Sequence, residues 1–293
     1  MDNRERARET LLAGLPVGER RRQLAGVSTA VLEGGSAGDG SSIVLLHGPG
    51  EFAATWLPVL PGLAHAHHVV VPDLPGHGAS RIEKGPLDAD RVLRWLDELI
   101  EQTCPAPPVL VGRTVGGAIA ARFAAAGNHR RLAALVLVDT LGLTAFDPAP
   151  RFGIALHRFL GSPTRRSYER LMEFCVFDLD RVREHLGLRW DPFAAYAVEL
   201  AGDDHVQAAL GSLIGQFAAA AIPPEQLARI DVPTTLVWGR HDLATPLSVA
   251  EAASARFGWP LHVVENAGDD PALDQPDAFV DALQAALGTV AVR

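Results

Sequence analysis

The sequence predicts an α/β fold with a mostly parallel central sheet, helices on both faces and an inserted helical cap. Three features of the 293-residue chain lead to this prediction: short β-branched runs bounded by turn residues, helical patterns between several of them, and one long segment without a convincing strand. Strands that alternate with helices form parallel sheets joined by right-handed crossovers. Because α/β folds often use this length as one unit, one core with about eight strands is expected.

The expected strands are short runs of valine, leucine and isoleucine. The middle and later runs are continuously apolar, which is typical of strands covered by helices on both faces. The strand runs are Val27–Leu32, Ile43–Leu46, Val69–Val71, Val109–Val111, Leu135–Val138, Thr235–Trp238 and His262–Val264. The helical patterns between them include Asp88–Gln102, Gly116–Ala126, Ser248–Phe257 and Pro276–Leu287.

The chain divides into three parts by composition. Residues 1–24 are polar and predict a loosely held, helical N-terminal arm. Residues 25–139 and 230–293 carry the strand and helix patterns of the core. Residues 140–229 have helical patterns that several prolines break into short helices. A helical insertion between two strands predicts a cap over the carboxyl edge of the sheet, where open α/β sheets bind ligands.

Composition excludes several classes of partner. The chain has 26 Lys and Arg against 35 Asp and Glu, a net charge of −9, so neither nucleic acid nor an acidic membrane is expected. Cys104 and Cys175 are far apart and form no metal-binding pattern, which indicates a reduced, cytoplasmic protein without a structural metal. The start lacks the apolar segment of a signal peptide, and the uncharged stretch Val206 to Pro224 is interpreted as a cap or buried helix. No cofactor is expected, and the chain is expected to be a monomer or homodimer.

Six motifs occur in the order and spacing of a known family. They are IVLLHGPGEFAATW from Ile43, VVVPDLPGHGAS from Val69, VLVGRTVGGAIAARFA from Val109, LVLVDTLG from Leu135, TTLVWGRHD from Thr234 and ENAGDDPALDQPDAF from Glu265. Across Val27 to Leu287 the chain resembles the α/β-hydrolase family. The resemblance implies the α/β-hydrolase fold and, in typical members, catalysis by a Ser-His-Asp triad.

The family's nucleophile elbow corresponds to Gly112-Arg113-Thr114-Val115-Gly116 in this chain. Thr114 stands where the family usually has serine. The elbow residue has a positive φ, which is particularly unfavourable for a β-branched side chain. Two interpretations stay open: Thr114 is a working nucleophile held against that cost, or it is a remnant of the elbow that lines a pocket.

The acid and base positions of the resemblance both fall on aspartates. Asp242 takes the acid position, although an aspartate there could also form a turn and cap the next helix. Asp269 stands where the family has its histidine. A hydroxyl nucleophile needs a base matched to neutral pH, and an aspartate with an ordinary pKa of about 3.9 is a poor one. His47 and His77 are interpreted as structural, and His241 as turned away.

The oxyanion hole also departs from the family pattern. One expected donor is the N–H of Val115, but the second position is Pro49, which has no N–H. Gly50 or Glu51 could donate if the loop is shifted. The nucleophile, the base and one oxyanion donor are therefore altered together. Because these groups act as a unit in catalysis, the effects of changing them do not add, and only weak catalysis by binding is expected to remain.

The same correspondence predicts that Asp242 and Asp269 lie close together, with Asp270 in the same site. Two close carboxylates cannot both ionise easily, so one should hold a proton near neutral pH and serve as a general acid. The alternative is that Arg113, Arg240 or water neutralises the pair.

Three functions remain open at this point. The first is an enzyme without the usual triad that acts on a small, largely apolar molecule. Its chemistry would be acid–base or non-hydrolytic: that of a lyase, isomerase or cyclase, or the opening of an epoxide or lactone. The second is a catalytically silent ligand-binding or scaffold protein, and the third is an atypical esterase. An enclosed pocket faced by Asp242 and Asp269 would favour an enzyme, and a collapsed pocket would favour the second function.

Overall fold

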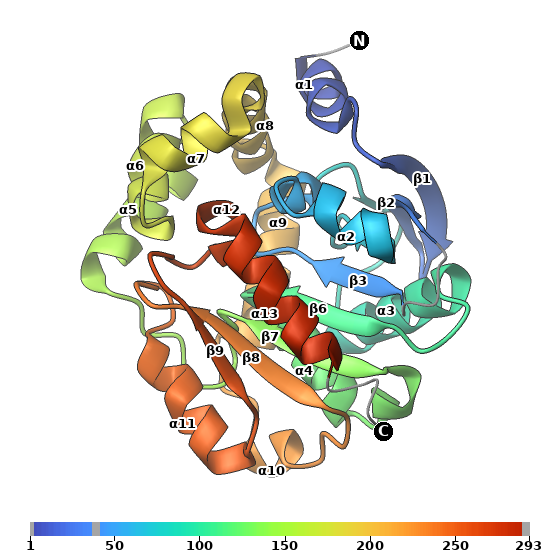
Figure 1. Ribbon diagram of the computed structural model, residues 1–293. Helices are drawn as coiled ribbons and strands as arrows, with labels where there is room; N and C mark the ends of the chain where they lie inside the picture. Colours follow the sequence, from blue (N-terminus) through green and yellow to red (C-terminus); the bar gives the residue numbers. More distant parts are fainter. Residues whose placement is uncertain (1–2, 37–41, 289–293) are drawn as a thin grey trace.

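The computed structural model describes residues 3–36 and 42–288, and within these ranges nine strands form one sheet (Figure 1). The strand order is β1-β2-β4-β3-β6-β7-β8-β9, and β5 pairs with β2. Neighbouring strands are parallel from β4 through β3 and β6 to β9, whereas β2 pairs antiparallel with β1, β4 and β5. The predicted α/β class and mostly parallel sheet are confirmed. The strands are β1 (Val17–Leu24), β2 (Val27–Gly35), β3 (Ile43–Leu46), β4 (His68–Pro72), β5 (Arg81–Ile82), β6 (Val109–Arg113), β7 (Ala134–Val138), β8 (Thr234–Gly239) and β9 (Leu261–Val264).

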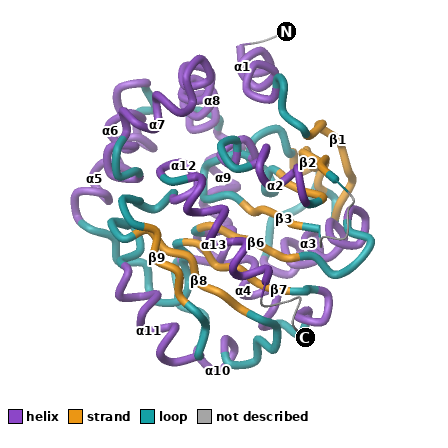
Figure 2. Tube along the Cα trace, in the orientation of Figure 1, coloured by secondary structure: helices purple, strands orange, loops and turns teal. Residues whose placement is uncertain are grey.

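Helices cover both faces of the sheet (Figure 2). Residues of α3, α4 and α11 pack on one face, and residues of α2 and α13 pack on the other. The four predicted core helices correspond to α3, α4, α11 and α13. The helices are α1 (Asn3–Leu12), α2 (Leu60–Ala66), α3 (Ala89–Thr103), α4 (Val115–Ala125), α5 (Pro150–Gly161), α6 (Arg165–Cys175), α7 (Leu179–Leu186), α8 (Trp190–Ala201), α9 (Asp204–Leu213), α10 (Pro224–Leu227), α11 (Leu247–Phe257), α12 (Pro271–Asp274) and α13 (Pro276–Gly288).

Strand residues alternate between two apolar cores. On β6, Leu110 packs with the α3 and α4 side, whereas Val109 and Val111 pack with the α2 and α13 side. This is the two-residue period of a strand whose successive side chains point to opposite faces. Because both faces are covered, the strand appears in the sequence as an uninterrupted apolar run.

The segment between β7 and β8 contains the helices α5 to α10 and no strand among its described residues. Figure 1 shows α5 to α8 together at one end of the molecule, far from α10 and α11. A third apolar cluster joins these cap helices to Phe52 and Leu273 of the core. The uncharged stretch that begins at Val206 forms α9 and a π-helical turn (Ile214–Ala218). No helix in the described ranges has both the length and the apolar character needed to cross a membrane.

The N-terminal segment is held more tightly than the sequence predicted. Residues 17–24, which the prediction placed in a loose arm, form β1 and pair with β2 along its length. β1 exposes most of its side chains, so no apolar alternation marks it as a strand. Arg8 of α1 forms a buried ion pair with Asp73 of the core at 2.8 Å and donates to the Tyr196 hydroxyl of the cap at 3.2 Å.

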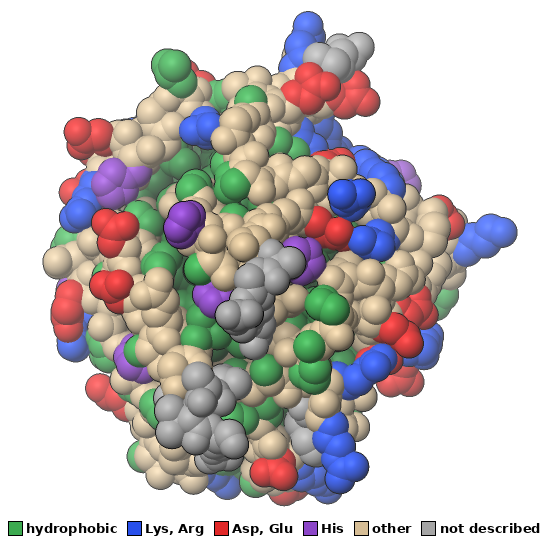
Figure 3. Space-filling view, turned by 45° about the vertical axis from the view of Figure 1, so that its right-hand side comes forward, with side chains coloured by type: hydrophobic (Ala, Val, Ile, Leu, Met, Phe, Trp, Pro, Cys, Tyr) green, Lys and Arg blue, Asp and Glu red, His purple; other side chains and the backbone are tan. Residues whose placement is uncertain are grey.

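Acidic and basic side chains are interspersed on the face of the molecule shown in Figure 3.

Candidate functional site

Thr114 keeps the strained conformation of a nucleophile elbow. It lies between β6 and α4 with φ +47° and ψ −112°, a backbone conformation that residues other than glycine rarely adopt. The flanking glycines permit the sharp turn, because a Cβ on Gly112 would lie 2.4 Å from the carbonyl oxygen of Gly116. Thr114 is buried, and its Oγ1 has no hydrogen-bond partner among the residues that the structure describes. The turn has therefore not relaxed, despite the β-branched side chain.

Four neighbouring strands each end at a buried polar residue. Thr114 follows β6, Asp139 follows β7, and Asp242 lies just beyond β8. Asp269 lies beyond β9. Because parallel strands place their carboxyl ends along one edge, these side chains gather at one edge of the sheet. The sequence analysis missed Asp139, although its place directly after the apolar run LVLV was the available signal.

Asp139 and Asp242 are neighbouring buried carboxyl groups, and Oδ2 of each has no hydrogen-bond partner among the described residues. Asp242 Oδ1 accepts from the N–H groups of Ala244 at 2.7 Å and Thr245 at 2.8 Å, and Asp139 Oδ1 accepts from Gly239 N–H at 2.9 Å. Burial raises the pKa of Asp242 to about 7, although those N–H groups oppose the shift. Burial and the adjacent Asp242 together raise the pKa of Asp139 well above its usual value. The two neighbouring carboxyl groups therefore ionise less readily than ordinary aspartates.

Asp269 presents a carboxyl group without a partner. Its side chain is buried, and Oδ1 has no hydrogen-bond partner within the described part of the chain. Its backbone N–H donates to the carbonyl oxygen of Cys175 in the cap at 2.8 Å. Burial first, and the charge of Asp242 second, raise the pKa of Asp269 well above its usual value. A carboxyl group with a raised pKa keeps its proton to a higher pH than an ordinary aspartate, and in that form it can donate an O–H.

Arg113 is held by carboxylates other than the expected pair. It forms ion pairs with Glu51 and, at 3.2 Å, with Asp270, and it donates to the carbonyl oxygen of Asp269 at 3.0 Å. Burial opposes its charge, but Asp270 and Glu51 outweigh burial and raise its pKa. Burial raises the pKa of Asp270 to about 7, with Arg113 opposing. Arg240, the other candidate for neutralising the aspartates, lies on the surface and pairs with Glu265.

The region of the expected oxyanion hole contains a carboxylate. Glu51 Oε2 accepts from the N–H of Gly48 at 2.9 Å. A Cβ on Gly48 would lie 2.6 Å from Thr114 Oγ1 and 2.9 Å from Glu51 Oε2, so the hydroxyl and the carboxylate flank the same small space. That Gly50 or Glu51 supplies the second N–H donor stays a prediction, and the Glu51 side chain brings negative charge to the same loop. Val115, the other expected donor, is buried at the start of α4.

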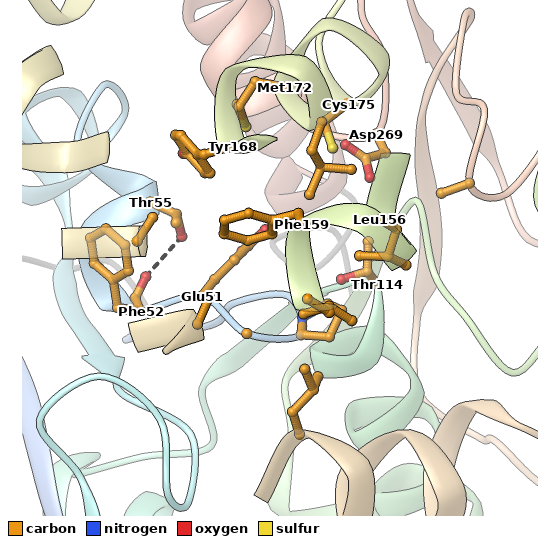
Figure 4. A pocket seen from close by; sticks show the side chains of 18 of the residues that line it. Glu51, Phe52, Thr55, Thr114, Leu156, Phe159, Tyr168, Met172, Cys175 and Asp269 are labelled. Carbon is orange, nitrogen blue, oxygen red and sulfur yellow. Dashed lines mark hydrogen bonds between the residues drawn. The ribbon is translucent and has the colours of Figure 1, made fainter. Parts of the chain in front are cut away.

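An enclosed cavity of about 260 Å³ lies between the core and the cap. Thr114 and Asp269 line it together with Pro49, Gly50 and Glu51, whereas the other predicted site residues, Arg113, Val115, Asp242 and Asp270, do not. Figure 4 shows Thr114, Asp269 and Glu51 around this cavity with rings from α5 and α6. The aromatic lining residues are Phe52, Phe146, Phe152, Phe159, Tyr168 and Phe193.

The three histidines near the motifs do not line the cavity. His47 Nε2 accepts from the N–H of Leu74 at 2.9 Å, and burial lowers the pKa of His47. Burial and neighbouring His47 lower the pKa of His77 to about 4. His241 is exposed and lies against the ring of Phe177, with ring centroids 4.7 Å apart.

Comparison with known proteins identifies the family. The sequence profile of the Alpha/beta hydrolase family matches residues 43–282. A 2-hydroxy-6-oxononadienedioate/2-hydroxy-6-oxononatrienedioate hydrolase from Pseudomonas putida is 31% identical over 249 residues, covering 79% of this chain and 82% of that protein. A pimeloyl-[acyl-carrier protein] methyl ester esterase from Aeromonas hydrophila subsp. hydrophila is 26% identical over 257 residues, covering 86% of this chain and 97% of that protein.

A solved structure has the same fold. The 2-hydroxy-6-oxo-6-phenylhexa-2,4-dienoate hydrolase from Rhodococcus sp. strain RHA1 matches with a TM-score of 0.79 and 24% identity, covering 93% of this chain and 99% of that chain. The chain therefore belongs to the alpha/beta hydrolase family.

Proposed function

We propose that this member of the alpha/beta hydrolase family is an acid–base enzyme that acts on a small, largely apolar molecule. Asp269 would give its proton to an oxygen atom of the substrate, and the Thr114 hydroxyl would hold that oxygen in place. The observation that carries the proposal is that Thr114 Oγ1 and Asp269 Oδ1 are both buried, both lack partners among the described residues, and both belong to residues that line one apolar cavity. A buried polar atom without a partner costs about 1–3 kcal/mol, so a ligand that satisfies both atoms is favoured.

The proposed chemistry needs a proton donor and, for ring opening, one water molecule. As the C–O bond of the substrate breaks, its electron pair goes to the oxygen, which takes the Asp269 O–H proton. In an elimination the Asp269 carboxylate then removes a proton from the adjacent carbon, so that a C=C bond forms and water leaves. In the opening of an epoxide or lactone, a water molecule instead bonds to the carbon and gives a proton to the carboxylate. This sequence suits the opening of an epoxide or lactone and the elimination of a hydroxyl group; isomerisation needs the same donor and acceptor. Of the two aspartates only Asp269 lines the cavity, and a titratable side chain in the wall of an apolar cavity favours this function over a catalytically silent binding protein.

Ester hydrolysis is the second candidate function. The strained φ of Thr114 and the names of the relatives, which are esterases and hydrolases, favour it. Two features oppose it. Asp269 occupies the base position, and its raised pKa favours the protonated form, which cannot take a proton from Thr114. The Glu51 carboxylate lies beside Thr114, where negative charge would develop on a tetrahedral intermediate.

The direct test is a screen of uncharged, apolar epoxides, lactones and hydroxy ketones for turnover, measured by mass spectrometry. Turnover of at least one of these classes is expected. Binding of such compounds without any turnover would favour the silent binding protein instead.

Activated aryl esters are expected to show negligible turnover, and serine-directed phosphonates are expected not to label Thr114. Without an imidazole base the Thr114 hydroxyl stays protonated and weakly nucleophilic. Intact-protein mass spectrometry checks the labelling. The matched control Thr114→Ser should stay silent because the base is still missing, whereas the double variant Thr114→Ser, Asp269→His should gain labelling. Stoichiometric labelling of the wild type at Thr114 would replace the acid–base proposal by hydrolysis.

A further inference from the structure

The cavity combines an aromatic wall with an unusual set of charges. No Lys, Arg or His occurs among the described residues that line it, whereas the two carboxyl residues Glu51 and Asp269 do line it. The Glu51 side chain is 28% exposed, so part of it remains accessible from the cavity. Two of the other polar side chains of the wall, Thr55 and Gln207, donate to the backbone carbonyl oxygens of Phe52 and Ala201.

The nearest cation to the cavity is already paired. Arg113 does not line the cavity, and its side chain is only 3% exposed. Its guanidinium forms ion pairs with Glu51 and Asp270 and donates to the carbonyl oxygen of Asp269. Reaching Arg113 would require an anionic ligand to displace Glu51, which also accepts from the Gly48 N–H.

We infer that Glu51 makes this cavity selective for uncharged ligands and excludes carboxylates. A carboxylate that enters an apolar cavity loses its hydration and recovers that loss only beside a cation or several donors. Among the described lining residues it would find no cation and only the neutral donors Thr114, Tyr168 and Asp269, and it would meet the like charge of Glu51 at reduced dielectric. An ammonium ligand gains little either, because Arg113 and the Gly48 N–H already satisfy the Glu51 carboxylate.

This inference narrows the substrate class of the proposed function and uses the same cavity. The inferred selectivity depends on the charge of Glu51 and not on proton transfer by Asp269. The selectivity inference and the acid–base proposal can therefore fail separately. Loss of turnover with intact selectivity would contradict only the acid–base proposal.

The test compares two ligands of equal shape, 4-phenylbutanamide and 4-phenylbutanoate, by calorimetric titration at about pH 8, where the acid is ionised. The wild type is expected to bind the amide at least about tenfold more tightly than the acid. In Glu51→Gln the preference should fall at least about tenfold, because the charge that repels the acid is removed and Arg113 is released from one carboxylate. The amine 4-phenylbutylamine should bind no better than the amide.

The control variant is Thr55→Val, which changes a lining side chain of similar shape without changing charge, and it should keep the wild-type preference. If Glu51→Gln does not fold, the comparison of amide and acid binding by the wild type still tests the inference. Equal binding of acid and amide by the wild type would overturn the inference, as would an unchanged preference in Glu51→Gln. Tighter binding of the amine would assign a cation site instead, and binding of none of the three compounds would also contradict the inference.

Discussion

Replacing Asp269 by Asn is expected to lower turnover of an accepted substrate at least about a hundredfold, the lower scale of general acid–base catalysis. Asn is nearly isosteric with a protonated Asp and keeps the packing, but it has no proton that it can transfer. Asp269 is buried beside the cavity with an unpartnered oxygen, so solvent cannot easily supply the missing proton. Steady-state kinetics on any compound found in the screen measures the loss.

The matched control for this experiment is Asp281→Asn, an exposed aspartate on α13. It should retain wild-type turnover. The binding affinity of 4-phenylbutanamide should also change little in Asp269→Asn, which separates a catalytic role from a packing defect. A loss of less than about tenfold in Asp269→Asn would remove Asp269 from the catalytic step.

Replacing Arg113 by Met should lower the free energy of unfolding by about 3–5 kcal/mol at pH 8, the usual cost of breaking a buried ion pair. Arg113 is the buried cation that pairs with the partly exposed carboxylate of Glu51 and the buried carboxyl group of Asp270. Without it these groups lose their partner inside the protein. The pKa of Asp270 is about 7, so Asp270 is mostly protonated at pH 5 and needs the cation less. Urea unfolding at pH 5 and pH 8 should therefore give a smaller loss at the lower pH.

Arg240→Met is the control for this stability prediction. Arg240 pairs with Glu265 at the surface, where ion pairs contribute little to stability. It should unfold like the wild type at both pH values. Losses of similar size for both arginine variants, or a larger Arg113→Met loss at pH 5 than at pH 8, would show that the buried network is not organised around Arg113.

Much of the sheet could be predicted from the sequence because its strands are covered on both faces. The runs that became β3, β6, β7 and β8 are uninterrupted apolar segments, and such segments have few alternative folds. β1 and β5 were missed for the opposite reason. β1 has the sequence VGERRRQL with most side chains exposed, and β5 is only two residues long. Their pairing with β2 is decided by tertiary contacts that no local pattern records.

The candidate site was predicted in position but not in detail. The motif order placed Thr114, Asp242 and Asp269 at the edge of the sheet, because each follows a recognisable strand directly or within a few residues. The spacing of motifs does not show which way a side chain points. The ion pair between the Glu51 carboxylate and Arg113 was therefore not predicted.

The protonation of Asp269 is the central claim, and the free energy of unfolding between about pH 4 and pH 8, compared for wild type and Asp269→Asn, tests it most directly. The pKa of Asp269 is raised on folding, so its contribution to stability is fully present below its unfolded pKa of about 3.9 and is lost as pH rises through the folded pKa. We predict that the wild type loses stability relative to Asp269→Asn across this range, while Asp281→Asn follows the wild type. Parallel curves for wild type and Asp269→Asn would mean that the carboxyl group ionises normally in the folded protein, and they would contradict its role as the proton donor.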